Sequence, residues 1–281
     1  MKIKKNIFLF LLFSVLLNSY PSTAQPSRNL TGGTDFVTIN NTTVPTHDLY
    51  MVDSIDAGNQ IKHAASFEIK VNSSENVKKI LADFQSYMAK NQSFLLVFSK
   101  ANLQFSVFEQ RTYTAAKVKE LTLSALSASA KEGVTITIKI QAEQVAIAYD
   151  KANKINSPIS SKTGVVLASN YRFELNGQSM NRVIEISSLQ IGNTTGETHR
   201  FSIEITGAEA QTWYDWFNNT KNEDKKKSVR ITLLGPDQRT ELFTVELTNA
   251  EVIYLSVQSN SSQETISRTK IGLRASAAVF K

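Results

Sequence analysis

The chain contains no cysteine, and this absence excludes several kinds of site at once. It can form no disulfide, no thiolate metal site and no lipid anchor on a cysteine at an export cleavage point. Only three histidines occur, His47, His63 and His199, and none has the spacing of a metal-binding motif. Each histidine is expected in a loop or at the start of a strand. The fold must therefore rest on its core, and no metal or cofactor is expected.

The usual signatures of catalysis are also missing. No Gly-x-Ser-x-Gly elbow accompanies His47-Asp48, and Thr31-Gly32-Gly33-Thr34 lies in the N-terminal tail, where flexibility explains it better than phosphate binding. The acidic pairs are expected on strand faces that point to solvent: Glu143 with Asp150, and Glu241 with Glu246. Because no nucleophile, base and orienting group can be assembled, the sequence predicts a protein that is not an enzyme.

After its first residues the chain has no apolar run long enough to span a bilayer. The first residues read as a signal peptide, residues 1–24, because a basic start precedes an apolar run from Ile7 to Leu17 and a small-residue site at Ser22 and Ala24. Cleavage after Ala24 would place the chain in the periplasm or outside the cell. An uncleaved anchor is the alternative.

Strong charge of one sign is absent as well. The formal charge is +6, and removal of residues 1–24 takes away three lysines and no acidic residue, which leaves +3. That balance gives no argument for a nucleic-acid partner. Apolar residues make up 41% and charged residues 20%, as in folded soluble proteins.

What the sequence does contain is an internal repeat. Residues 36–149 align with residues 171–280 at an offset of about 134. Both copies carry a strand in which apolar and polar residues alternate: Phe67, Ile69 and Val71 in the first copy, and Phe201, Ile203 and Ile205 in the second. Alternation of period two predicts a sheet with one buried face.

A helix is expected after this strand in both copies. In the first, Ser74 can act as N-cap for a helix with its apolar residues on one face: Val77, Ile80, Leu81, Phe84 and Met88. In the second, Gly207 precedes a shorter helix that carries four aromatic residues: Trp213, Tyr214, Trp216 and Phe217.

Two strands are expected after each helix, followed by a Thr-x-Ala-x-Val segment. The strands are Phe94–Phe98 with Leu103–Phe108, and Val229–Leu234 with Leu242–Leu247, the latter joined by the hairpin signal Gly235-Pro236-Asp237. The segments are Thr114–Val118 and Thr248–Val252.

These patterns predict a mostly β protein with a domain at 34–150, a linker at 151–167 and a second domain at 168–281. Six or seven short strands and one flanking α-helix per copy favour a β-sandwich or partly closed barrel.

The second copy resembles the tail tube proteins of contractile phages. The matching segments are Tyr171–Gly177, Glu185–Leu189 with Ser188 in place of the family's glycine, the aromatic helix Trp213–Asn218, the basic run Lys225–Lys227 leading into Val229–Leu234, and Phe243–Ala250 with its Asn249-Ala250 end. The first copy matches less well, since its helix lacks tryptophan and Thr114-Ala115-Ala116 lacks the asparagine.

The resemblance implies the two-sheet fold shared by phage tail tubes and the haemolysin-coregulated tube protein of type VI secretion, whose domains form stacked six-membered rings. Baseplate hub proteins of such machines carry two of these domains per chain and reach pseudo-sixfold symmetry as trimers. The signal peptide is a departure, because tail tubes assemble in the cytoplasm. The resemblance implies a structural homo-oligomer, with a trimer as one arrangement, and the signal peptide implies that it acts outside the cytoplasm.

The aromatic helix is the sharpest candidate site. Trp213, Tyr214, Trp216 and Phe217 cannot all face one side of a helix, so some must be buried and others exposed. Core packing, an aromatic edge for subunit contact and a platform for a glycan are the alternatives. A monomeric exported module that binds a glycan or surface protein through its loops and exposed aromatics, such as Trp216, is therefore the competing hypothesis.

Overall fold

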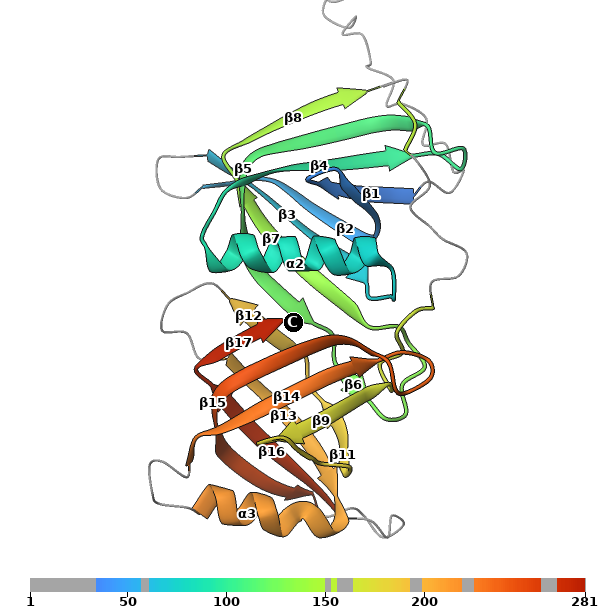
Figure 1. Cartoon of the computed structure of the whole chain (residues 1–281). Coiled ribbons are helices and arrows are strands. Elements are labelled where there is room, and N and C mark those ends of the chain that lie inside the picture. Colours follow the sequence, from blue (N-terminus) through green and yellow to red (C-terminus); the bar gives the residue numbers. More distant parts are fainter. Residues whose placement is uncertain are drawn as a thin grey trace, which may run out of the picture. The chain divides into compact units, whose positions relative to one another are not determined.

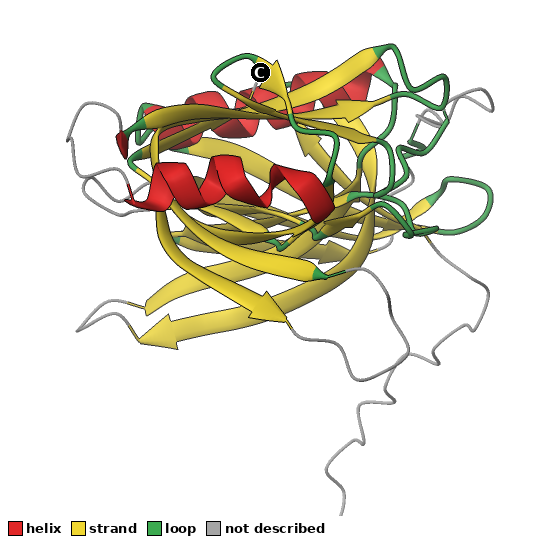
Figure 2. Cartoon of the chain, turned by 90° about the horizontal axis from the view of Figure 1, so that it is seen from below, coloured by secondary structure: helices red, strands yellow, loops and turns green. Residues whose placement is uncertain are grey.

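The structure is a computed structural model, and it describes residues 34–56, 61–149, 153–155, 164–192, 199–218, 225–258 and 267–280. The predicted signal peptide lies outside these residues. The described chain is mostly β, and each half has one α-helix lying across its strands (Figures 1 and 2). This confirms the predicted fold class of two mostly β domains with a flanking helix each.

The first half closes its strands into a barrel. Its elements are β1 (Thr34–Ile39), β2 (Thr42–Asp56), β3 (Ile61–Lys70), α2 (Glu75–Ala89), β4 (Phe94–Ala101), β5 (Val107–Leu123), β6 (Leu126–Ser127), β7 (Thr135–Ala142) and β8 (Gln144–Tyr149). The strands pair in the order β5-β4-β1-β2-β3-β7, and β7 pairs again with β5, which closes the ring.

The second half repeats this order. Its elements are β9 (Tyr171–Leu175), β10 (Gln178–Ser179), β11 (Val183–Ile186), β12 (Leu189–Gly192), β13 (His199–Thr206), the short 3₁₀ helix η1 (Gly207–Glu209), α3 (Ala210–Asn218), β14 (Lys227–Leu234), β15 (Glu241–Gln258), β16 (Arg268–Ala275) and β17 (Ala277–Phe280). Here β15 pairs with β14, β16 and β17, as β5 pairs with β4, β7 and β8.

Helix α2 forms where the sequence predicts it. The Ser74 hydroxyl accepts a hydrogen bond from the backbone N–H of Val77 at 3.3 Å, which confirms the predicted N-cap. All five predicted apolar positions of this helix are buried. Phe84 places its ring 5.7 Å from that of Phe67 and 5.9 Å from that of Phe94, so the helix is fixed to β3 and β4 through aromatic contacts.

Both long strands carry a bulge at the same place. In β5 the pairing to β4 shifts between Phe94–Ala116 and Leu96–Tyr113, and in β15 the pairing to β14 shifts in the same way beside Ala250. The extra residue has a positive φ in both halves, 52° at Ala115 and 51° at Asn249. A second shift follows in each strand, after Val118 and after Val252. The Thr-x-Ala-x-Val segments of the sequence are therefore paired bulges.

These bulges correct the expectation of short strands. β5 and β15 run for 17 and 18 residues, because each bends at its bulges and continues with new neighbours instead of ending. In the second half, the predicted strand Leu242–Leu247 and the segment Thr248–Val252 are parts of one strand, β15. In the first half, the predicted strand Leu103–Phe108 is wrong at its start, because Leu103 lies in a turn and β5 begins only at Val107.

We expect Ala115→Asn to raise the free energy of unfolding by about 1 kcal/mol, because an L-alanine in the left-handed region costs roughly 1–2 kcal/mol and asparagine is better suited to it. Asn249 already occupies the equivalent position, and Ala115 lines an open hollow with room for an amide. Asn249→Ala should lower stability by a similar amount. Urea unfolding checks both, with Ala146→Asn on β8 as the control; equal effects at Ala115 and Ala146 would contradict the strain argument.

The halves exchange strands with one another. β12, from the second half, pairs with the end of β5, placing Leu189 opposite Leu123 and Gly192 opposite Glu120. In return β6 pairs with β11 of the second half, with Leu126 opposite Ile186. The buried residues of both halves form one continuous cluster. The halves are thus joined by backbone pairing as well as by the chain between them.

The C-terminal end of the predicted linker is packed into the first half. Val166 is fully buried, and its backbone pairs on one side with Val71 and on the other with Val134. The domain and linker bounds themselves stay a prediction.

The hairpin signal between β14 and β15 is confirmed. The Asp237 carboxylate accepts hydrogen bonds from the backbone N–H groups of Arg239 and Thr240, each at 3.0 Å, and from the Thr240 hydroxyl at 2.7 Å. These bonds lower the pKa of Asp237 to about 2 and hold the turn closed.

Candidate functional site

The aromatic helix α3 divides its side chains between core and surface. Trp213 is fully buried and lies 6.1 Å from Phe173 and 5.5 Å from Trp216, measured between ring centroids. The indole N–H of Trp213 is buried and has no hydrogen-bond acceptor among the described residues. Its role is therefore to fill the core beneath the helix.

Trp216 is also buried, with 4% of its surface exposed, so the expectation of an exposed aromatic at this position is wrong. Its indole N–H donates to the Lys225 carbonyl at 2.7 Å, and the Lys227 ammonium lies 5.6 Å from its ring centroid. These contacts fasten the start of β14 to the helix. The basic run Lys225–Lys227 is thus partly fixed by a cation–π contact and a hydrogen bond.

The surface part of the cluster is Phe217, which is 43% exposed, together with the partly exposed Tyr214. Any contact with a partner or glycan would therefore be made by Phe217 and Tyr214. That role stays a prediction.

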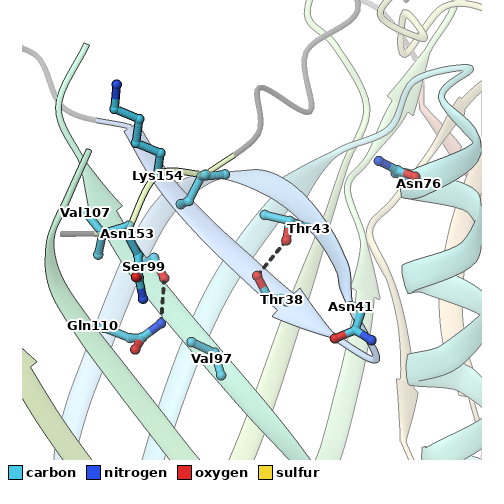
Figure 3. A pocket seen from close by; sticks show the side chains of 11 residues that line it. Thr38, Asn41, Thr43, Asn76, Val97, Ser99, Val107, Gln110, Asn153 and Lys154 are labelled. Atoms are coloured by element: carbon cyan, nitrogen blue, oxygen red, sulfur yellow. Dashed lines mark hydrogen bonds between the residues drawn. The ribbon is translucent and has the colours of Figure 1, made fainter. Parts of the chain in front are cut away.

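A polar hollow of about 470 Å³ lies over β1, β2, β4 and β5 (Figure 3). It is lined by Thr38, Asn41, Thr43, Asn76, Val97, Ser99, Val107, Gln110, Asn153, Lys154 and Ile155. The hydroxyls of Thr38 and Thr43 are 2.8 Å apart, and the Gln110 amide donates to Ser99 at 3.4 Å. This lining offers neutral donors and acceptors, one ammonium and no carboxylate, so it can bind polar groups but supplies no acid–base pair.

The corresponding face of the second half is occupied by ion pairs instead. Arg172 on β9 contacts Glu174 at 3.2 Å and also pairs with Glu241, while Arg230 on β14 lies 3.2 Å from Glu241. Arg230 takes the position on β14 that Val97 holds on β4, as the pairings to β9 and β1 show. The predicted solvated Glu241 is therefore part of a cross-strand network. Such exposed pairs contribute little stability individually.

A further charged group lies where β1, β4 and β5 meet. Glu109 is bonded to Arg111 at 2.8 Å and to Lys100 at 3.2 Å. Burial opposes the charge on Glu109, but these two partners outweigh it and lower its pKa. Burial raises the pKa of Asp35, and Lys100 lessens that effect. This arrangement stabilises a strand junction.

Glu120 ties the two halves together in a pH-dependent way. It accepts hydrogen bonds from Thr122 and from Gln190 on β12, and lies 2.8 Å from the Lys139 ammonium. Burial raises the pKa of Glu120, but the bonds from Lys139, Thr122 and Gln190 outweigh burial and hold this pKa below its usual value. A lowered folded-state pKa contributes stability above the unfolded value, and that stability is lost as the pH falls through the folded value.

We therefore expect the free energy of unfolding to drop as the pH falls from about 5 to about 3, and to drop less steeply in Glu120→Gln. Urea unfolding across this range measures both slopes. Glu143→Gln, at an exposed bend, is the control. The same pH slope in the wild type and in Glu120→Gln would contradict this assignment.

The structure corrects the placement of two histidines. His47 and His63 lie inside β2 and β3, and only His199 begins a strand. Among the described residues, no group of three histidine or acidic side chains could hold a metal ion. Asp150, the predicted partner of Glu143, lies outside the described residues. Within the same residues, no helix is long and apolar enough to cross a membrane.

No protein-family model and no curated protein matches the chain. Among solved structures, it is similar to a chain of the sheath–tube complex of an extracellular contractile injection system, at 14% identity and a TM-score of 0.33, over 40% of this chain and 87% of that one. It is similar to the tube-terminating cap of the anti-feeding prophage, at 15% identity and a TM-score of 0.34, over 47% and 95%. A sheath/tube terminator of an extracellular contractile injection system matches at 14% identity and a TM-score of 0.32, over 45% and 99%.

Proposed function

We propose that this chain is an exported structural protein that forms rings, each chain supplying two of the six positions and three chains completing the circle. One observation carries the proposal: the two halves repeat one strand order and are joined side by side through backbone pairing of β12 to β5 and β6 to β11. A ring requires this kind of lateral contact to be repeated between chains. The resemblance of residues 171–250 to tail tube proteins supports it independently.

The outer strands of the two sheets are compatible with assembly. β8 and β17 occupy equivalent positions beside β5 and β15, and among the described strands each pairs with that neighbour only. β8 exposes Ile147 and Tyr149, at 44% and 64%. Unprotected edges of this kind are usually covered or blunted in monomers, and a neighbouring subunit is one way to cover them.

The test is the mass and shape of the purified chain. Analytical ultracentrifugation over a range of concentrations should show a trimer, and negative-stain electron microscopy should show rings with six similar lobes. A strict monomer at every concentration, with no ring in the images, would overturn the proposal.

We propose that residues 1–24 direct export and are removed. Intact-mass measurement of the chain released to the periplasm or medium should give a form that begins at Gln25. A mass that retains these residues would instead support the uncleaved anchor.

The hollow in Figure 3 favours a second candidate, an exported binding module for a glycan or surface protein. Its amide and hydroxyl lining suits sugar hydroxyls, and Phe217 is exposed on the other half. Retention on glycan resins that is lost in Gln110→Ala, or in Phe217→Ala, would support it. Trp216→Ala is unsuitable for this test because the side chain is buried. Absence of retention by a folded monomer would exclude it.

A further inference from the structure

Inside the chain, β12 pairs with the C-terminal end of β5, but the equivalent end of β15 has no such partner among the described strands. β5 and β15 correspond residue for residue, because both shift register after Val118 and Val252 against equivalent strands. On this correspondence Leu123 in β5 matches Val257 in β15. One edge of β5 pairs first with β4 and then, toward its C-terminal end, with β12. The same edge of β15 pairs with β14 up to Ala250 and has no partner strand beyond it among the described residues.

The exposed fractions of Leu123 and Val257 differ in the way that the missing partner strand predicts. Leu123, which faces Leu189 of β12, is 1% exposed, and Val257 is 55% exposed. Tyr254, the counterpart of Glu120, is 41% exposed and its ring lies over Gly272, where a Cβ atom would come within 2.0 Å of it. The C-terminal end of β15 thus has exposed apolar side chains and an unpaired edge at the position where β5 is covered by β12.

The chain also contains the strand that would fill it. β12 precedes β13 along the chain as the end of β2 precedes β3, and β13 and β3 pair with the equivalent strands β16 and β7. Among the described strands β12 pairs with β5 and not with β13, whereas the end of β2 pairs with β3. On the pairings of β11 to β13 and β2 to β3, the segment that matches β12 is the end of β2, from about Val52 to Asp56. This end of β2 pairs with β3, and no second partner strand is described for it.

We infer that the open edge of β15, from Tyr254 to Val257, is completed by a second copy of this chain, whose β2 end pairs with it as β12 pairs with β5 inside the chain. The inference rests on the proposed ring and names its contact. One chain offers the β15 edge and the next offers the β2–β3 hairpin, so the contact is head-to-tail. Such a contact repeats until the ring closes.

Val257→Lys tests the edge. The side chain is exposed in the single chain, so the fold should tolerate the change to within about 0.5 kcal/mol. A lysine at a position that pairing would bury opposes the contact, so trimers should dissociate to monomers that remain folded, as circular dichroism would show. Leu103→Lys, at a 66% exposed position in the turn between β4 and β5, is the control and should leave the trimer intact. Val279→Lys, at a 41% exposed position of β17, shows separately whether that edge takes part in the ring.

Cysteine pairs test the occupant, which a cysteine-free chain makes unambiguous. Ser256 corresponds to Thr122, which lies opposite Gln190 of β12. Ser256→Cys is therefore combined, one pair per variant, with Val52→Cys, Asp53→Cys or Ser54→Cys. At least one pair should form disulfides between chains, seen as a ladder on non-reducing gels. Ser256→Cys with Ala146→Cys on β8 should give none.

The outcomes separate this contact from the proposed function. If the wild type forms rings that survive Val257→Lys and no pair on β2 cross-links, this contact is wrong while the ring stands. If Val279→Lys dissociates the ring and Val257→Lys does not, β17 is the interface. If the wild type is a monomer at every concentration, both proposals fail.

Discussion

Trp213→Ala is expected to lower the free energy of unfolding by about 3–5 kcal/mol, the largest effect of any single change in α3. The side chain is fully buried between Phe173 and Trp216, so its removal leaves a cavity that a short helix over a sheet cannot close. Guanidinium or urea unfolding followed by circular dichroism measures the loss.

Two further variants show whether packing alone is responsible. Trp213→Phe should cost much less, because it retains an aromatic ring and removes an indole N–H that is buried without an acceptor among the described residues. Phe217→Ala, on the exposed side of α3, should change stability by no more than about 0.5 kcal/mol. A large loss in Phe217→Ala would show that the surface of this helix is covered in the native protein.

Leu189→Ala is expected to cost about 2–5 kcal/mol although it lies in a strand of four residues. Leu189 is fully buried opposite Leu123, at the point where the second half supplies a strand to the first. Because the buried cluster is continuous across both halves, the wild type should unfold in one transition.

The two tryptophans make this measurable, since both lie in α3 and their fluorescence reports on the second half alone. Fluorescence and far-ultraviolet circular dichroism should give coincident curves in the wild type and separate curves in Leu189→Ala. Ile253→Ala, at a 37% exposed position of β15, is the control. Separate transitions already present in the wild type would show that the halves unfold independently.

The part of the fold that could be predicted from the sequence is the part encoded locally. Helix α2 follows from its period and from Ser74, whose side chain needs only its own neighbours to act as a cap. The turn at Asp237 is equally local, because its carboxylate bonds to residues two and three positions ahead.

The long strands could not be predicted in the same way. At Ala115 and Asn249 an extra residue interrupts the alternation of period two, and a pattern search reads such an interruption as a strand end. The sequence aligns the two positions, but only the pairing to β4 and β14 shows that each is an extra residue within a continuous strand. The exchange of β6 and β12 is harder still to predict, because the sequence of such short strands does not indicate with which half each will pair.

The candidate site shows the same limit. Helical spacing correctly requires that Trp213, Tyr214, Trp216 and Phe217 be divided between core and surface. It does not say which side faces the core, and that depends on contacts with Phe173 and with the Lys225 carbonyl. The polar hollow is assembled from four strands, the β1–β2 turn, the start of α2 and the segment 153–155, so no single stretch of sequence identifies it.

The exchange of strands also determines where the chain can be divided. A fragment that stops near residue 150 would contain nearly all of the first barrel but would lack β12 and Val166, leaving Leu123 uncovered and the end of β5 open. A fragment that begins near residue 168 would lack β6 and leave β11 unpaired on one side. Each fragment would expose an unpaired strand edge that favours aggregation. We therefore expect that the two copies of the sequence repeat cannot be produced separately as folded domains.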